Sequence, residues 1–279
     1  QPSDLPGGSN YLDPVLMHNG RIERYKGYCT DVFTSEAIRF IEENRRRPFL
    51  LYFPNYGVHA PRQAKPELIA KYQRKVRPGM KQTNASYAAM IDSLDQGVGK
   101  LVDALKRAGV YDRTVFIVTS DNGGSFASTS NHPLRSQKGS AYEGGVRVPL
   151  IVRLPGVTKP ASTCATPVIG VDFFPTLLEI AGVKRRAKVD GESIVPLLRG
   201  KGRLRRDAIY WHYPHYHAGS ASPHSAIRSG DFRLVEFQED GRCELYNVES
   251  DIGESRDLAG QMPDKAGEQT ELARFSSEE

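Results

Sequence analysis

The feature that most constrains the fold is an alternation of short, uninterrupted apolar runs with longer segments of helical periodicity. Three apolar runs are predicted as buried strands: Phe49–Phe53, Thr114–Thr119 and Val148–Val152. Three other segments are predicted as helices: Ser35–Asn44, Ser86–Ala108 and Phe173–Ala181. Strands buried on both faces and alternating with helices are typical of α/β proteins. We therefore expect an α/β fold with a mostly parallel sheet sandwiched by helices.

The clearest of these elements is the helix predicted over Ser86–Ala108. Its apolar residues recur at steps of three or four: Tyr87, Ile91, Leu94, Val98, Leu101 and Leu105. This spacing places them on one helical face, and Gly109 supplies a stop directly after the helix. The segment is therefore expected to pack one apolar face against the rest of the chain.

Beyond about residue 205 the apolar segments become shorter and more polar, and glycine turns separate them. Three of these segments are predicted as strands: Ala226–Arg228, Phe232–Phe237 and Cys243–Val248. This pattern favours a small antiparallel α+β subdomain. We expect an α/β domain over residues 1–204 and a C-terminal antiparallel subdomain over residues 205–279.

Composition excludes several classes of protein. No apolar run approaches the roughly 18 residues that a membrane span requires, so no membrane span is expected. The three cysteines are widely spaced and form no Cys-x-x-Cys, which argues against a zinc cluster or a dense disulfide framework. Residues 236–279 hold 13 acidic and four basic side chains, although the net charge of the chain is +5, so the preceding part is basic. Its densest basic stretch, Lys184–Arg206, lacks interleaved aromatic residues, and nucleic acid is not an expected partner.

Polar side chains follow the strand predicted over Thr114–Thr119. Asp121 offers a carboxylate and Asn122 an amide oxygen, and two glycines directly follow them. In open α/β sheets functional groups gather beyond the carboxyl ends of strands, and adjacent hard oxygen donors suit Ca²⁺ or Mg²⁺. The alternative interpretation is a plain Asp-Asn-Gly turn, which is common.

Two further side chains are candidates for catalysis. His59 lies on a loop shortly after the run Phe49–Phe53, and a histidine there can act as an acid or a base near neutral pH. Lys138 lies in a glycine-containing loop before Val148–Val152, and its ammonium group suits an oxyanion such as sulfate or phosphate. Taken singly, each is equally compatible with an ordinary exposed loop residue.

Four of the seven histidines lie between residues 212 and 224. The spacing of His212, His215 and His217 could ligate Zn²⁺, but the intervening Pro214 and the absence of a thiolate argue against a zinc site. Surface packing is the simplest alternative for these side chains.

Together and in this order, the segments resemble the sulfatase family of the alkaline-phosphatase-like superfamily. The resemblance extends from about Tyr25 to Leu258. The segments that carry it are Pro48–Tyr52, His59–Pro61, Thr119–Gly124, Lys138–Gly139, Tyr142–Pro149, Asp172–Leu177, Asp190–Gly191, Leu197–Leu198, Ile227–Arg233 and Glu244–Asn247.

The resemblance implies a role for each candidate. Asp121 and Asn122 would be two ligands of a single catalytic Ca²⁺, and His59 and Lys138 would contact the sulfate and the leaving-group oxygen. His215 and His217 would line the substrate entrance. Relatives that act on phosphate or phosphonate esters have an Asp-His-like pair at the position of Asp121-Asn122 in this chain. Their borderline metal ion prefers imidazole as a ligand. The expected partner is thus a sulfated small molecule or glycan, and the sequence leaves the oligomeric state open.

The nucleophile motif of the family is missing from the chain. That nucleophile is a formylglycine made from Cys or Ser within Cys/Ser-x-Pro-x-Arg, yet none of the 18 prolines has Cys or Ser two residues before it. The paired aspartates that would complete the Ca²⁺ site are also absent. We expect the chain to be the C-terminal portion of a longer sulfatase that hydrolyses an aryl or carbohydrate sulfate ester. Formylglycine is expected in the missing segment, and the chain is expected to be inactive alone.

Two alternatives to this function remain. The first is a phosphodiesterase or phosphonate hydrolase of the same superfamily. The second is a non-catalytic homologue that binds sulfated glycans through its basic body. The resemblance also implies a periplasmic, secreted or lysosomal location, although the chain shows no targeting segment.

Overall fold

The computed structural model of the chain describes residues 10–184, 188–216 and 222–275. The chain divides into two compact units. The first contains residues up to 114 together with 127–129, and the second contains residues 115–126 and those from 130 onward. A domain boundary near residue 204 stays a prediction.

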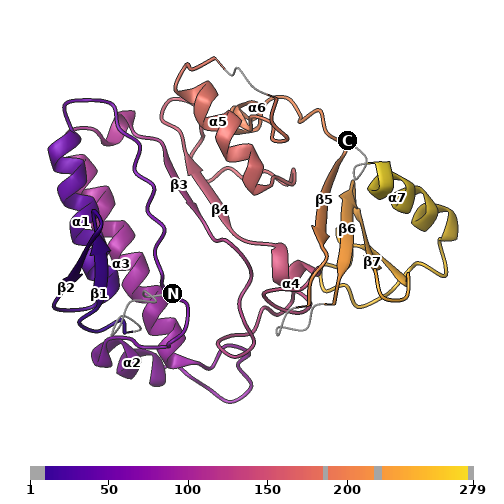
Figure 1. Ribbon diagram of the computed structural model, residues 1–279, viewed down its shortest axis with the longest axis horizontal. Helices are drawn as coiled ribbons and strands as arrows, with labels where there is room; N and C mark the ends of the chain where they lie inside the picture. The colour runs from indigo at the N-terminus through magenta and orange to yellow at the C-terminus, as the bar shows by residue number, and fades with distance from the viewer. Residues whose placement is uncertain (1–9, 185–187, 217–221, 276–279) are drawn as a thin grey trace. The chain divides into compact units, whose positions relative to one another are not determined.

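The first unit consists of a β-hairpin and three helices (Figure 1). Strands β1 (Val15–His18) and β2 (Arg21–Arg24) pair antiparallel. Helix α3 (Ala85–Arg107) packs against both α1 (Cys29–Asn44) and α2 (Pro66–Gln73), and the short helix η1 (Tyr111–Arg113) follows α3. One buried hydrophobic cluster of this unit contains Tyr11, Leu16, Tyr28, Cys29, Ala64, Leu68, Ala89 and Met90.

The long helix predicted from its periodicity is confirmed to within one residue at each end. Asn84 caps it, because the Asn84 side-chain oxygen accepts a hydrogen bond from the Tyr87 N–H at 3.0 Å. Gly109 follows with a φ of +68°, the left-handed conformation that glycine adopts readily at helix ends.

The prediction of a strand over Phe49–Phe53 is wrong. This segment has no strand partner among the described residues, and Leu50 and Tyr52 are 74% and 82% exposed. Phe49 packs edge-on against Phe40, with ring centroids 5.7 Å apart. An apolar run favours burial, but a strand forms only where a neighbouring strand satisfies its backbone groups.

The second unit begins with strands β3 (Phe116–Thr119) and β4 (Leu150–Arg153). Both lie within or next to the predicted runs, but they pair antiparallel rather than parallel. The chain between them forms a loop and one short helix, α4 (Glu143–Val146), instead of a long crossover helix. Since a parallel pair requires such a crossover, this connection returns the chain in the opposite direction.

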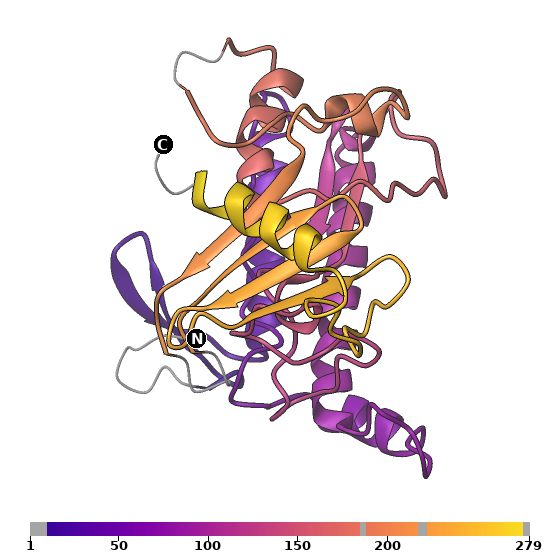
Figure 2. The ribbon, with the colours of Figure 1, turned by 90° about the vertical axis from the view of Figure 1, so that its right-hand side faces the viewer.

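A four-stranded antiparallel sheet forms the C-terminal part of this unit, as the sequence predicts. Its strands follow in the order β5 (Ala208–Tyr213), β6 (His224–Ser229), β7 (Phe232–Phe237) and β8 (Cys243–Asn247). Helix α7 (Pro263–Phe275) lies across one face of the sheet (Figure 2). The core beneath this helix contains Ala208, Ile227, Leu234 and Leu245.

A buried aspartate joins the remaining helices of this unit. Asp172 lies in the turn η2 (Gly170–Asp172) before α5 (Phe173–Ile180) and pairs with Arg206 at 2.5 Å. Burial opposes ionisation of Asp172, but the hydrogen bonds from Arg206 and from backbone N–H groups lower its pKa below the usual range. The Ile194 N–H also donates to the Thr176 hydroxyl at 3.0 Å. These two contacts attach the segment 194–206, which contains α6 (Val195–Leu198), to α5.

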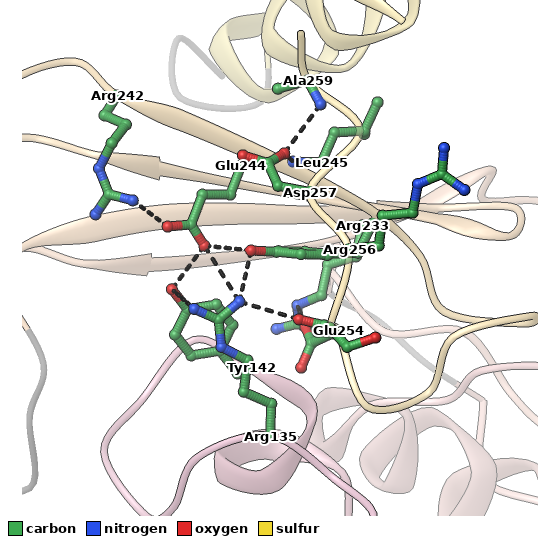
Figure 3. Close-up of polar contacts among 12 residues, drawn as sticks. Arg135, Tyr142, Arg233, Arg242, Glu244, Leu245, Glu254, Arg256, Asp257 and Ala259 are labelled. Carbon is green, nitrogen blue, oxygen red and sulfur yellow. Dashed lines mark hydrogen bonds and ion pairs between the residues drawn. The ribbon is translucent and has the colours of Figure 1, made fainter. Parts of the chain in front are cut away.

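The other face of the C-terminal sheet carries a buried charge cluster (Figure 3). Arg233 of β7 is fully buried, and its guanidinium donates to Glu143 Oε1 at 2.9 Å and to the carbonyl oxygen of Ala141. Glu254, also buried, accepts the backbone N–H of Glu143 at 2.8 Å. The start of α4 is therefore bonded to β7 and to the loop after β8.

A second set of contacts lies beside this cluster (Figure 3). The Glu244 carboxylate accepts hydrogen bonds from Tyr142 at 2.7 Å and Tyr246 at 2.6 Å, and it pairs with Arg242. Arg135 lies over the Tyr142 ring at 3.9 Å and donates to the Tyr246 hydroxyl at 2.5 Å. The segment 135–143 is thus held on the sheet at both of its ends.

Two glycines of α3 predict opposite effects of the same substitution. A Cβ on Gly97 would lie 2.7 Å from Thr34 Oγ1, which is buried and bonded to the Thr30 carbonyl, whereas a Cβ on Gly99 meets nothing within 4 Å. We expect Gly97→Ala to destabilise the protein by about 1–3 kcal/mol. Gly99→Ala should stabilise it by about 0.5–1 kcal/mol because alanine favours the helix. Urea unfolding of both variants tests this, and equal shifts would contradict the α1–α3 packing.

The burial of Glu254 leads us to expect that the stability of the protein depends on pH. Burial raises the pKa of Glu254 from 4.5 to about 7, although Arg233 and the Glu143 N–H act in the opposite direction. Because the folded-state pKa lies above the unfolded-state pKa, the stabilisation that Glu254 provides is complete below the unfolded value and is lost as pH rises through about 7. We therefore expect the free energy of unfolding to fall more steeply with rising pH in the wild type than in Glu254→Gln. Urea midpoints of both proteins across this range measure the difference, and parallel curves would refute it.

Candidate active site

Asp121 and Asn122 lie directly beyond the end of β3, as predicted. Asp121 is exposed and Asn122 half-buried. The only polar contact of the Asp121 carboxylate among the described residues is the Ser120 hydroxyl at 3.5 Å, and that hydroxyl also donates to the Asn122 carbonyl at 3.2 Å. One carboxylate and one side-chain amide thus remain available for a ligand.

Backbone contacts attach this turn to α4. The Gly123 N–H donates to the Gly145 carbonyl at 2.9 Å. A Cβ on Gly123 would lie 1.8 Å from the Gly144 carbonyl oxygen, and a Cβ on Gly145 would lie 2.2 Å from that of Ser140. A side chain at Gly123 would collide with the segment of α4, and a side chain at Gly145 would collide with the chain that precedes α4. Glycine is therefore required at Gly123 for the approach of the two segments.

Asn131 holds the same turn from a third segment, and sequence reasoning missed it. Its side-chain oxygen accepts the Gly124 N–H at 3.0 Å, and its side-chain nitrogen donates to the carbonyls of Gly124 at 2.7 Å and Ser136 at 3.0 Å. All its contacts are to backbone groups, which leave no signal in a single sequence.

Lys138 is brought to the same assembly. Its backbone N–H donates to the Gly124 carbonyl at 3.1 Å. Its side chain is half-buried, and within the described part of the chain no carboxylate pairs with its ammonium group. The predicted residues Asp121, Asn122 and Lys138 therefore lie on two segments joined by backbone hydrogen bonds.

His59 belongs to the first compact unit, where the backbone around it is fixed. Its N–H donates to the Tyr56 carbonyl at 2.9 Å, and its own carbonyl accepts from the Tyr11 hydroxyl at 3.0 Å. Burial raises the pKa of Tyr11, so its hydroxyl remains a donor. The imidazole is exposed, and Nδ1 lies 3.0 Å from the Ala60 carbonyl. Because a carbonyl only accepts, Nδ1 carries hydrogen, and Nε2 is the atom left for chemistry.

The histidines after β5 are only partly described. His215 is exposed, with its ring 5.4 Å from that of Tyr213 in an edge-on contact. His217 lies outside the described residues. His212 Nδ1 lies 3.0 Å from the Ser225 hydroxyl, and burial lowers the pKa of His224, which favours its neutral form.

The residues present fit only part of a metal site. Over residues 10–184, 188–216 and 222–275, no three His, Cys, Asp or Glu side chains are grouped so that they could hold a metal ion. Asp121 and Asn122 offer hard oxygen donors, which is the chemistry that Ca²⁺ prefers, but a full shell needs about six to eight oxygens. The pair therefore fits a fraction of a Ca²⁺ site.

No helix in the described part of the chain is both long and apolar enough to cross a membrane.

Comparison with known families and proteins agrees with these observations. Residues 4–183 match the family described as Sulfatase, and residues 136–274 match the C-terminal region of N-sulphoglucosamine sulphohydrolase. A sulfatase of Formosa agariphila is 36% identical over 94% of this chain and 52% of its own length. An N-acetylglucosamine-6-O-sulfatase of Bacteroides thetaiotaomicron is 32% identical over 75% of this chain and 36% of its own length. The chain thus spans about half the length, or less, of these curated relatives.

Solved structures give the same result. The chain is similar to Ps i-CgsB in complex with k-i-k-neocarrahexaose, with a TM-score of 0.83 and 30% identity over 94% of this chain and 58% of that one. It also resembles BT4656, whose structure contains D-glucosamine-2-N,6-O-disulfate, with a TM-score of 0.84 and 22% identity over 96% of this chain and 73% of that one.

These neighbours confirm the predicted fold class, an alkaline-phosphatase-like α/β fold with a small antiparallel C-terminal sheet. The matched regions include Asp121, Asn122, Lys138 and His59. The family match covers well over half of the chain, and the chain belongs to the sulfatase family.

Proposed function

We propose that the protein to which this chain belongs hydrolyses sulfate esters of carbohydrates, with Asp121 and Asn122 as two ligands of one Ca²⁺. The observation that carries this proposal is the loop assembly of the second unit. There a carboxylate and an ammonium group that have no charged partner within residues 10–184, 188–216 and 222–275, together with an available amide, are carried by segments whose backbone contacts leave no space for a Cβ at Gly123. Family membership supports sulfate as the anion that this assembly would bind.

The charges of this assembly suit a sulfate group. When bound, Ca²⁺ supplies Lewis-acid stabilisation of the negative charge on the sulfuryl oxygens. The Asp121 carboxylate and the Asn122 amide oxygen would hold that ion, and the Lys138 ammonium group would add a compact positive charge near the sulfuryl oxygens. Because the Lys138 backbone is bonded to Gly124, its side chain starts from a fixed position beside the metal ligands.

His59 is proposed to protonate the leaving group. Its Nδ1–H is directed to the Ala60 carbonyl, so in the imidazolium form Nε2–H is the proton available to the departing alcohol oxygen. The hydrogen bonds from His59 to Tyr56 and from Tyr11 to His59 fix the backbone from which the ring projects.

We further infer that these 279 residues do not turn over a sulfate ester by themselves. The formylglycine nucleophile of the family requires Cys/Ser-x-Pro-x-Arg, and the sequence contains no such motif. Under the same interpretation, Lys138, Asp121 and Asn122 are one portion of an active site.

A sulfated sugar is the favoured substrate class. One relative is named for N-acetylglucosamine 6-O-sulfate, and two solved neighbours hold a carrageenan oligosaccharide and a disulfated glucosamine. His215 and His217 would line the entrance for such a sugar. A periplasmic, secreted or lysosomal location would give the enzyme access to sulfated glycans.

A phosphonate or phosphodiester hydrolase is the second candidate. The chain is also similar to the phosphonate monoester hydrolase of Agrobacterium radiobacter, with 26% identity and a TM-score of 0.57 over 70% of this chain and 41% of that one. Asn122 favours the sulfatase, since an amide oxygen suits Ca²⁺ and the imidazole of an Asp-His pair suits a borderline metal ion. A non-catalytic glycan-binding homologue would retain binding but show no hydrolysis.

Removing the Asp121 carboxylate tests the metal site. In the full-length protein, we expect Asp121→Ala to lower kcat/KM for a sulfated glucosamine at least about 100-fold, because charge stabilisation of this kind is typically worth that much. Calorimetric titration should show weakened Ca²⁺ binding. Asp103→Ala, which alters an exposed carboxylate on α3, is the matched control and should leave both quantities unchanged. Undiminished Ca²⁺ affinity in Asp121→Ala would refute the assignment.

Metal replacement separates the two candidate hydrolases. After chelation, Ca²⁺ should restore hydrolysis of a sulfate ester by the full-length protein, whereas Mn²⁺ and Zn²⁺ should not. Asn122→His should shift the metal ion that best restores activity from Ca²⁺ toward Mn²⁺ or Zn²⁺, because the substitution replaces a hard oxygen donor with imidazole. Recovery with Mn²⁺ on a phosphonate ester would favour the other hydrolase, and Ca²⁺-independent binding of sulfated glycan without hydrolysis would favour the non-catalytic homologue.

A further inference from the structure

Arg233 is a buried charge that the proposed chemistry does not use. Its side chain is 0% exposed, on the face of β7 opposite to Leu234 and helix α7. A guanidinium is costly to bury unless it is paired, and the pairing here is specific. One terminal nitrogen donates to Glu143 Oε1 and the other to the Ala141 carbonyl, while Nε lies 3.7 Å from Glu254.

One apolar cluster on this face of the sheet includes Ala141 of the loop. Its buried residues are Ala141, Ala226 and Val235, with Trp211 and Phe237 packed beside them, and Ile209 and Tyr246 are buried on the same face. The Arg233 guanidinium lies over the Trp211 ring at 4.6 Å. Apolar contacts are non-directional and do not by themselves fix the register of a loop, whereas hydrogen bonds to one carbonyl and one carboxylate do.

Glu143 connects this buried pair to the candidate active site. It begins α4, and the two glycines that follow it contact Gly123 through backbone atoms alone. A backbone contact with no space for a Cβ cannot be relieved by a side-chain rotation, so displacement of α4 moves the turn that carries Asp121 and Asn122. Lys138 lies in the same stretch, between Arg135 and Ala141, and both of these residues are bonded to the C-terminal part of the unit.

We propose that Arg233 is a positioning residue for the candidate active site. Through Ala141 and Glu143 it fixes the segment that carries Lys138 and supports the turn of Asp121 and Asn122. The C-terminal sheet, far from these residues in sequence, is therefore the support on which they are aligned. The kinetic part of this inference rests on the proposed sulfatase function, but the structural part does not.

The test compares two substitutions at neighbouring positions of β7 in the full-length protein. Arg233→Met removes the hydrogen bonds to Ala141 and Glu143 but keeps an apolar stem. Leu234→Ala, the matched control, weakens the opposite face of the same strand beneath α7. Arg233→Lys keeps the charge but has one nitrogen in place of the two terminal nitrogens of the guanidinium, so it cannot reproduce the geometry of both bonds.

Hydrogen exchange of the backbone amides of residues 138–147 is the first measurement. We expect exchange there to be at least about tenfold faster in Arg233→Met, intermediate in Arg233→Lys and unchanged in Leu234→Ala. If Arg233→Met fails to fold, the comparison of Arg233→Lys with Leu234→Ala decides. Equal exchange at 138–147 in wild type and Arg233→Lys, or faster exchange in Leu234→Ala as well, would overturn the positioning role.

Kinetics and Ca²⁺ titration are the second measurement. In Arg233→Met, kcat for a sulfated glucosamine should fall at least about tenfold and the Kd for Ca²⁺ should rise, with partial recovery in Arg233→Lys. Leu234→Ala should retain both values at a temperature where it is folded. A wild-type protein that neither binds Ca²⁺ nor hydrolyses the ester would refute the proposed function alone, because hydrogen exchange tests the positioning independently.

Discussion

The contact between the backbone of Gly123 and that of Gly144 and Gly145 is the constraint on which the candidate site depends. It joins the turn after β3 to the start of α4 so closely that a Cβ at Gly123 would lie 1.8 Å from a carbonyl oxygen. Asn131 adds side-chain hydrogen bonds to the same turn. Three separate segments are thus held together mainly by groups that cannot rotate away. The backbone that carries the proposed site residues Asp121, Asn122 and Lys138 is thus held by these contacts.

Polar groups in the second unit divide into two kinds. Beneath the loop, charged side chains are buried and paired, as in Arg233 with Glu143 and in Glu244 with two tyrosines. At the loop itself, the carboxylate of Asp121 and the ammonium group of Lys138 have no charged partner in the described part of the chain. A site for a metal ion and an anion requires charged groups that are left available at the loop, because a site already neutralised internally would bind neither.

Some elements of the fold could be predicted from the sequence and others could not. The long helix over residues 85–107 and the strand Phe232–Phe237 were predictable because periodicity and turn glycines are local signals. The run Phe49–Phe53 carries the same apolar signal as a buried strand, yet Leu50 and Tyr52 are exposed. Strand pairing depends on a partner elsewhere, and β3 and β4 likewise pair antiparallel although their composition suggests parallel neighbours.

By itself, the sequence determined the family and the residues that we propose for the site. The proposed site residues can be recognised because their side-chain types and the order of the surrounding motifs are properties of the sequence; they are Asp121, Asn122, His59 and Lys138. Only the tertiary structure decided how the site is supported. Asn131 and Arg233 act through contacts to backbone groups and to residues as much as 92 positions away. Such contacts follow from how the chain closes on itself, and no local pattern of residues records that closure.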